Sequence, residues 1–370
     1  MNLPIFLLLI LLQLAYSQET CSREETLQRL REYIQRYYLW KEKLGPLPTW
    51  QDESEAIQFL RQKGDKWTTI TNIEEDRSWY SEGKLVGIGI RWDDKGQVVR
   101  VFRGSPAEKA GIRPGDIIYS INGERDNTKW SVVIRNTPAE KPVELVLIRN
   151  GLFVTVDVYK GPFVVDPIED VKVLEFMGKK LGYIHLVNFT MPALREFSAA
   201  LEKLISEGID GLVLDLRNNS GGLISVAKGI ADTLIGGEGV MFYLESAGNG
   251  VVLYEFSNRK GIGMPILVLV NRNTASAGEL LTALLKRYAK AVVAGENTFG
   301  KYVGSNVYPL NSCGKVVRLV TFVMKLPDGS PIAPDGGIRP DCPLGKDDSL
   351  SSALKCIKPL LPKEDFAITP

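Results

Sequence analysis

From Gly182 onward, short apolar segments alternate with longer amphipathic segments as far as Glu296. The apolar runs in GLVLDLR (211–217) and PILVLVN (265–271) are continuous, which is typical of strands buried on both faces. Strand–helix alternation of this kind predicts an α/β fold with a mainly parallel sheet. Because sites in such sheets gather at the carboxyl ends of strands, we expect functional residues just after these two runs.

The residues before this region predict two smaller parts. Apolar residues at helical spacing indicate helices over 24–40 and 53–62, which form a lead-in packed on the later part of the chain. From about Leu85, alternating apolar residues and Gly, Pro and Asn turns indicate a compact β-rich module that ends near Lys160.

The first residues have the pattern of a secretory signal peptide. The stretch from Leu3 to Tyr16 is apolar, and Ala15 and Ser17 supply the small residues of a cleavage site after Ser17. The alternative, a membrane anchor, is disfavoured because the run is too short to span a bilayer comfortably. We therefore expect an exported protein, periplasmic or extracellular, with no stable membrane anchor after cleavage.

Charge and cysteine content exclude several classes of function. With 45 basic and 44 acidic residues, the net charge of +1 indicates no nucleic-acid partner. Four cysteines in an exported chain favour structural disulfides, and their wide spacing lacks a CxxC zinc pattern. Cys313–Cys342 with Cys21–Cys356 is one of the three possible pairings.

The single histidine, His185, makes a Ser-His-Asp hydrolase and a histidine-rich metal site poor interpretations. It lies within the strand-like segment GYIHLVNF, where a structural or peripheral role is the better expectation. We expect no metal ion and no organic cofactor.

Two strand-to-helix junctions contain residues suited to chemistry. Gly221 and Gly222 follow the first buried strand, and Ser276 follows the second at the start of a helix. Backbone N–H groups at a helix N-terminus can stabilise an oxyanion, and glycines allow close approach to a substrate carbonyl. The alternatives are a helix-capping serine and a tight turn or phosphate-binding loop.

A serine nucleophile needs a base, and Lys301, in AGENTFGKYVG, is the chemical alternative to histidine. Its pKa must fall by about three units from about 10.4 to act near pH 7, which costs about 4 kcal/mol. Burial against Phe299, Tyr302 and Val303 would lower the pKa. The alternative is a solvated lysine.

Taken together, the motifs resemble those of the C-terminal processing (tail-specific) serine peptidases of family S41, which carry a PDZ domain. The matching segments occur in the family's order: YYLW, LVGIGI, GSPAEKAGIRPGDIIYSING, LGYIHLVNF, DLRNNSGG, NRNTASAGE, GENTFGK and LPDGSPIAPDGGIRPD. The resemblance implies a crotonase-like βα protease core with a small PDZ domain and an N-terminal helical segment. The implied boundaries are 1–17 signal peptide, 18–77 helical segment, 78–160 PDZ domain, 161–360 protease domain and 361–370 tail.

The resemblance also implies roles for individual residues. Ser276 is the nucleophile and Lys301 the general base of an endopeptidase that cleaves exported proteins at or near their C-termini through an acyl-enzyme. The oxyanion donors are the N–H of Ala277 and that of Gly221 or Gly222. Three charged residues support the site, in a scaffold of buried ion pairs: Asp215, Arg217 and Glu279.

One position departs from the family. The glutamine that usually follows the lysine by four residues is Ser305 here, and the neighbouring Asn306 is an alternative substitute. A serine accepts a hydrogen bond from the lysine with a shorter reach, so the dyad is a firmer prediction than a triad.

The β-rich module implies a second site. Gly87, Ile88, Gly89 and Ile90 match the loop that offers N–H groups to a peptide carboxylate, with Lys84 nearby. We expect this PDZ domain to recruit protein or peptide substrates with free C-termini and, as in related proteases, to gate the active site. Two alternative functions remain: a catalytically impaired scaffold that binds C-termini, and a crotonase-like acyl-CoA enzyme, which export disfavours.

Overall fold

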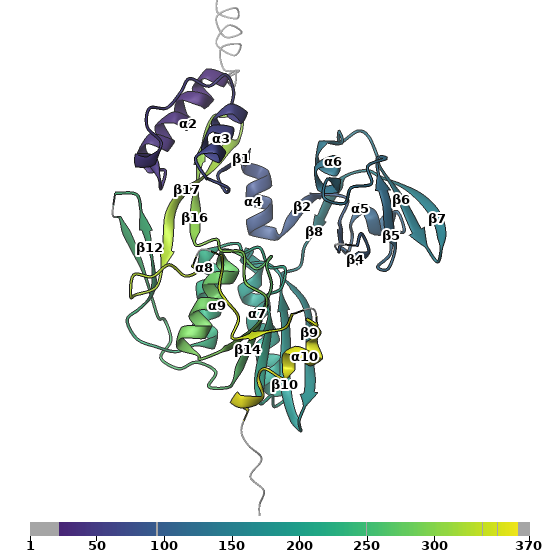
Figure 1. Cartoon of the computed structure of the whole chain (residues 1–370), viewed down its shortest axis with the longest axis vertical. Helices are drawn as coiled ribbons and strands as arrows, with labels where there is room; N and C mark the ends of the chain where they lie inside the picture. The colour runs from purple at the N-terminus through teal and green to yellow at the C-terminus, as the bar shows by residue number, and fades with distance from the viewer. Residues whose placement is uncertain (1–21, 94, 249, 335, 346, 362–370) are drawn as a thin grey trace, which may run out of the picture. The chain divides into compact units, whose positions relative to one another are not determined.

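The computed structural model describes residues 22–361 except 94, 249, 335 and 346 (Figure 1). The predicted signal peptide, Cys21 and all but the first residue of the predicted tail lie outside the described residues. The chain forms two compact units, and each combines separate stretches of sequence. Among the described residues, unit 1 contains 22–76, 238–256 and 301–334, and unit 2 contains 77–237, 257–300 and 336–361.

Unit 1 packs two helices on a five-stranded sheet. Helix α2 (Arg23–Tyr37) and helix α3 (Glu53–Gln62) confirm the two predicted helices, although α2 ends earlier than predicted because Tyr38 is extended. Leu30 of α2 is buried in one core with Val317 and Leu319 of the sheet. The strands, in the order β1-β17-β12-β13 with β16 also on β17, are β1 (Thr69–Asn72), β12 (Val240–Ser246), β13 (Val251–Glu255), β16 (Val303–Pro309) and β17 (Lys315–Lys325). A short 3₁₀ helix, η1 (Lys41–Lys43), follows α2, and α4 (Ile73–Glu82) carries the chain from unit 1 into unit 2.

The largest part of unit 2 is a six-stranded sheet in the order β18-β15-β14-β11-β10-β9. All neighbouring strands are parallel except β9 and β10, which confirms the predicted mixed α/β fold with a mainly parallel sheet. Every residue of β11 and β14 is buried, as the continuous apolar runs predict. The bounds are β9 (Ile168–Phe176), β10 (Lys179–Leu186), β11 (Gly211–Asp215), β14 (Ile266–Val270), β15 (Val292–Gly295) and β18 (Cys342–Pro343).

Elements on both faces bury this sheet. Helices α7 (Met191–Ser206), α8 (Ile224–Leu234) and α9 (Ala277–Tyr288) connect its strands, and α7 packs closely enough that a side chain at Gly182 would meet Leu204. Val213 and Leu267 face the opposite side, where they contact the segment around α10 (Leu350–Leu354), which η2 (Lys358–Leu360) follows. These two layers position the carboxyl ends of the strands.

The disulfide in this layer corrects one expectation. Cys342 of β18 is bonded to Cys356, just after α10, so the pairing of Cys342 with Cys313 and that of Cys356 with Cys21 are both wrong. The bond closes a loop with a sequence separation of 14 residues and ties the α10 layer to the edge of the sheet.

The β-rich module of unit 2 has its own core, which includes Ile88, Ile121, Trp130 and Leu145. Its strands form three small antiparallel sheets rather than one. They are β2 (Lys84–Gly87) with β8 (Gly161–Val164), β3 (Ile90–Trp92) with β4 (Val98–Val101), and β5 (Ile117–Ile121), β6 (Val143–Arg149) and β7 (Leu152–Val158). Two short helices complete the module, α5 (Pro106–Lys109) and α6 (Trp130–Asn136).

In the part of the chain that the structure describes, no helix is both long enough and apolar enough to cross a membrane.

Helix α7 offers a matched test of this core. Leu201 is 2% exposed and Ile205, one turn later, is 45% exposed. Leu201→Ala should lower the free energy of unfolding by about 2–5 kcal/mol because it leaves a cavity against the sheet. Ile205→Ala should cost about 1 kcal/mol or less. Equal losses for the two variants in urea titrations would contradict this packing.

Candidate active site

The loops that follow β11 and β14 are joined by asparagine side chains. The two strands are parallel neighbours, so they end at the same edge of the sheet. The side chain of Asn271 accepts from the Asn218 N–H and donates to the Asn218 side chain, both at 3.0 Å. Asn273 donates to the same Asn218 oxygen at 2.9 Å. The predicted glycine loop and serine loop are therefore brought together.

Two further residues align these loops and were not predicted from the sequence. The buried Thr274 hydroxyl donates to the Leu216 carbonyl at 2.8 Å, and the Ala275 N–H donates to the Asn219 carbonyl at 2.9 Å. The Asn219 side chain, fully buried, donates to the Leu186 carbonyl and accepts from the Gly221 N–H, both at 2.8 Å. An Asx residue two positions before a glycine is the sequence signal that indicates such a turn.

Ser276 lies at the N-cap of α9 in a strained backbone conformation, with φ 55° and ψ −115°. A side chain is disfavoured at positive φ, and residues held there cost about 1–3 kcal/mol. Ser276 is half-buried, whereas Ala277 next to it is fully buried. The strand-to-helix turn therefore presents the serine at the edge of the sheet, with the first N–H groups of the helix beside it.

The glycine pair packs directly against this turn. A Cβ on Gly221, whose φ is +100°, would lie 2.9 Å from the Ser276 Cβ and 3.0 Å from the Ala277 nitrogen. A Cβ on Gly222 would lie 2.6 Å from the Phe189 carbonyl oxygen. Only glycine fits at either position. The Gly221 N–H, one of the two predicted oxyanion donors, is donated to the Asn219 side chain.

Glu279 connects the start of α9 to the turn after β15. Its carboxylate, fully buried, accepts from the Ser276 N–H at 2.9 Å, from the Thr298 hydroxyl at 2.5 Å and from the Gly300 N–H at 2.7 Å. Thr298 was not predicted, and its hydroxyl also accepts the Ile338 N–H at 2.7 Å. Three donors satisfy a buried carboxylate that would otherwise be costly. Lys301 follows Gly300 directly in the sequence and begins a segment of unit 1.

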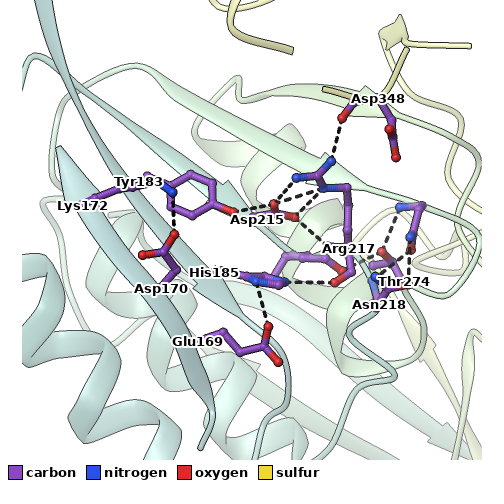
Figure 2. Close-up of polar contacts among 12 residues, drawn as sticks. Glu169, Asp170, Lys172, Tyr183, His185, Asp215, Arg217, Asn218, Thr274 and Asp348 are labelled. Carbon is purple, nitrogen blue, oxygen red and sulfur yellow. Dashed lines mark hydrogen bonds and ion pairs between the residues drawn. The ribbon is translucent and has the colours of Figure 1, made fainter. Parts of the chain in front are cut away.

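Asp215 and Arg217 form a buried ion pair at the end of β11 (Figure 2). Asp215 is 1% exposed and accepts from the Arg217 side chain and from the Tyr183 hydroxyl, the latter at 2.8 Å. Arg217 also donates to the Asp348 carbonyl at 2.7 Å. Burial, followed by the negative charge of Asp215, raises the pKa of Tyr183, so its hydroxyl stays a donor. This network has the geometry of a scaffold around the loops.

His185 joins this network through the Arg217 carbonyl oxygen. Its Nε2 lies 3.3 Å from the Arg217 carbonyl oxygen, and its Nδ1 lies 3.3 Å from the Glu169 carboxylate. Within the described residues, no group of three or more His, Cys, Asp or Glu side chains is arranged to hold a metal ion.

Comparison with known proteins identifies the family. The model of peptidase family S41 matches residues 180–344, and a PDZ domain model matches residues 97–149. A carboxyl-terminal-processing protease of a Picosynechococcus strain is 30% identical over an alignment of 327 residues, and the match spans 81% of this chain and 72% of that protein. The chain belongs to peptidase family S41.

Other relatives agree with this assignment. A "Probable CtpA-like serine protease" of Staphylococcus epidermidis is 30% identical over 296 residues, and the match spans 76% of this chain and 58% of that protein. The solved structure of a photosystem II D1 C-terminal processing protease matches with a TM-score of 0.61 and 25% identity, over 93% of this chain and 98% of that one. An S41 protein of Bacteroides fragilis, at 19% identity and a TM-score of 0.64 over 91% of this chain and 93% of that one, supports the fold alone. The chain is thus an S41-type serine peptidase with a PDZ domain.

The position of the S41 glutamine lies in strand β16 of unit 1. Ser305 pairs with Val320 of β17 next to a bulge at Gly304 and is half-buried. Asn306 is exposed, and its amide donates to Thr321 at 2.9 Å. The Asn306 amide is therefore held within its own sheet.

The predicted carboxylate loop of the PDZ domain joins β2 to β3. The Ile88 side chain is buried in the module core, and Gly89 has φ +80°. The carbonyl oxygens of Ile88 and Gly89 accept from Ala107 and Phe102, respectively, which fixes the loop from one side. The carboxylate-binding roles predicted for Gly87, Ile88, Gly89 and Ile90 stay predictions.

The strain at Ser276 can be measured without an activity assay. Ser276→Gly should unfold with a free energy about 1 kcal/mol higher than Ser276→Ala, because glycine adopts positive φ readily whereas alanine retains the strain. The same pair of substitutions at Ser225, an exposed residue in α8, should have the opposite sign, because glycine weakens a helix by about 1 kcal/mol. Denaturant unfolding of the four variants checks this, and an alanine variant as stable as the glycine variant at 276 would contradict the strained turn.

Proposed function

We propose that this chain is a serine endopeptidase that uses Ser276 as nucleophile and Lys301 as general base and cleaves exported proteins at or near their C-termini. The observation that carries the proposal is the strained, half-buried Ser276 at the start of α9, packed against Gly221 and beside the N–H of Ala277. We further propose that the protease core of this chain is crotonase-like, with its active site at the carboxyl ends of β11 and β14.

The proposed reaction follows from this arrangement. The Ser276 Oγ attacks the peptide carbonyl while the Lys301 amine takes its proton, and the negative charge moves to the carbonyl oxygen. The N–H groups of Ala277 and Gly222 donate to this oxyanion, and each such donor is worth about 3–4 kcal/mol in the transition state. The lysine then protonates the leaving amine as the peptide C–N bond breaks, which leaves the acyl group on Ser276. Water attacks this ester while the Lys301 amine takes its proton, and the lysine returns that proton to the Ser276 oxygen as the acid is released.

Glu279 supports both proposed partners through the main chain. It holds the nitrogen of Ser276 and that of Gly300, the residue before Lys301. Proximity and orientation account for much of the barrier reduction in such reactions, so this clamp makes Glu279 a positioning residue in the proposal. We assign the partner of the lysine amine to Ser305 rather than to Asn306, whose amide is bonded to Thr321.

We further propose that the PDZ domain recruits the substrate tail. The loop from Gly87 to Ile90 would bind the terminal carboxylate through its N–H groups, and the peptide would add as a strand beside β3. The substrate is then a protein or peptide with a free C-terminus, and the enzyme acts outside the cytoplasm after removal of the signal peptide.

The dyad is tested with an unstructured protein that ends in apolar residues. Ser276→Ala and Lys301→Ala should each reduce kcat by about 10²–10⁴ or more, because the nucleophile or its base is removed. Ser225→Ala and Lys260→Ala, at exposed positions of the same residue types, are the matched controls and should retain activity. Cleavage that survives either of the first two substitutions would exclude the dyad, and tail binding without cleavage by any form would favour the scaffold function.

Tail recruitment is tested with two versions of one substrate, with a free and with an amidated C-terminus. Amidation removes the charge that the PDZ loop would bind, so KM should rise about tenfold, as expected for the loss of a charged hydrogen-bonding group, while kcat stays unchanged. The internal control is an activated ester of a short peptide that is too small to reach the PDZ domain. This ester should be hydrolysed at the same rate whether its other end is free or amidated. Equal KM values for the two proteins would contradict recruitment by the tail.

A further inference from the structure

The ring of His185 lies between two groups that only accept hydrogen bonds. One is the Arg217 carbonyl oxygen, 3.3 Å from Nε2, and the other is the Glu169 carboxylate, 3.3 Å from Nδ1 (Figure 2). A neutral imidazole carries one N–H and offers a lone pair at its other nitrogen. Only the doubly protonated ring donates at both nitrogens, so this geometry favours an imidazolium.

The neighbouring strands place further charges around the ring. On β9 and β11, the residues in register with His185 are Asp170 and Asp215. Lys172 pairs with Asp170 at 2.6 Å, and Arg217 pairs with Asp215. Burial by itself would lower the pKa of His185, but the hydrogen bond to Glu169 and then the charge of Asp215 outweigh it, and the net effect is a raised pKa.

Glu169 also receives two cations from the PDZ domain. Arg91 of β3 contacts both carboxylate oxygens at 3.1 Å, and Arg100 of β4 pairs with the same group. The Glu169 side chain is 8% exposed. Burial would raise its pKa, but His185 and the two guanidiniums hold it at about 2, so the carboxylate is charged at any working pH. A hydrogen-bonded path therefore runs from the PDZ strands through Glu169 and His185 to the Arg217 carbonyl.

We propose that the His185 imidazolium is a positioning residue for the reaction, which acts by holding the Arg217 carbonyl at the start of the loop that ends in Gly221 and Gly222. The inference rests on the proposed function of that loop as an oxyanion site. The Asp215 carboxylate fixes the Arg217 N–H at 3.0 Å, and His185 fixes the carbonyl of the same residue. These two contacts hold Arg217 where the loop leaves β11. Deprotonation leaves the single remaining N–H on Nδ1 beside the Glu169 carboxylate, so the Arg217 carbonyl loses its donor at Nε2.

The protonation state is tested directly, because the chain contains one histidine. In protein without a histidine tag, the ring ¹⁵N signals belong to His185 alone. We expect the ring to titrate with a midpoint above the free imidazole value of about 6.5, with both nitrogens protonated below that midpoint, and Glu169→Gln to lower it. A midpoint at or below the free value, or one that Glu169→Gln leaves unchanged, would overturn the proposal.

The positioning role is tested by kinetics over the same pH range. A raised folded-state pKa means that the contact is present at low pH and is lost as the pH rises through that pKa. Wild-type kcat should therefore fall about tenfold, as for loss of one charged hydrogen bond, at the midpoint seen by NMR. In Glu169→Gln the fall should move to lower pH together with the NMR midpoint. In His185→Gln the pH-dependent fall in kcat should be absent, and kcat should be low at every pH with KM little changed. Lys180 is an exposed residue of the same strand, and Lys180→Gln should behave as wild type.

Hydrogen exchange separates failure of this proposal from failure of the proposed function. At pH 6.5, residues 216–223 should exchange faster in His185→Gln than in wild type or Lys180→Gln, whether or not the protein cleaves substrate. Absence of any Ser276-dependent cleavage would contradict the proposed function, and this readout would still decide the role of His185. Unchanged exchange of residues 216–223 in His185→Gln would overturn the positioning role even in an active enzyme.

Discussion

Strand β11 sets the position of the glycine loop and the serine turn. All five of its residues are buried, and it pairs in parallel with β10 on one side and β14 on the other. Such a strand has no solvent to satisfy its backbone where it ends, so each polar group there needs a protein partner. Thr274 donates to the Leu216 carbonyl just after β11, and Asn219 donates to the Leu186 carbonyl at the end of β10, so these two side chains hold the glycine loop beside the serine turn.

Buried carboxylates hold the surrounding elements in place. Glu279, Asp215 and Glu169 are each almost fully buried, and each receives several hydrogen bonds or cations. Desolvation of a carboxylate is expensive, and removing one partner leaves an uncompensated charge. These groups therefore resist local rearrangement, and each links segments that are distant in the sequence. In the proposed mechanism, that rigidity keeps Ser276 in a backbone conformation that it would not otherwise adopt.

These buried charges also act on different backbone segments of the proposed site. Glu279 acts on the main chain on either side of the proposed reaction, whereas the Asp215–Arg217 pair and His185 act on the loop of the proposed oxyanion donors. None of these side chains needs to touch substrate for its charge to matter, because each fixes a backbone group. Charges in the supporting layer can therefore affect the reaction as strongly as contacts with the substrate do.

Local pattern was sufficient for part of the secondary structure, although the strands of the unit 1 sheet were not predicted. The continuous apolar runs predicted β11 and β14, the helical spacing predicted α2 and α3, and the ordered motifs placed Ser276 at a strand-to-helix turn, because periodicity and capping depend on near neighbours in sequence.

Contacts between distant segments were decided by the tertiary structure. The Cys342–Cys356 bond, the use of the Gly221 N–H by Asn219, and the two acceptors around His185 each depend on how strands and loops meet in space. Unit 1 likewise combines three separate stretches of sequence, which burial of a shared core brings together and no local pattern records.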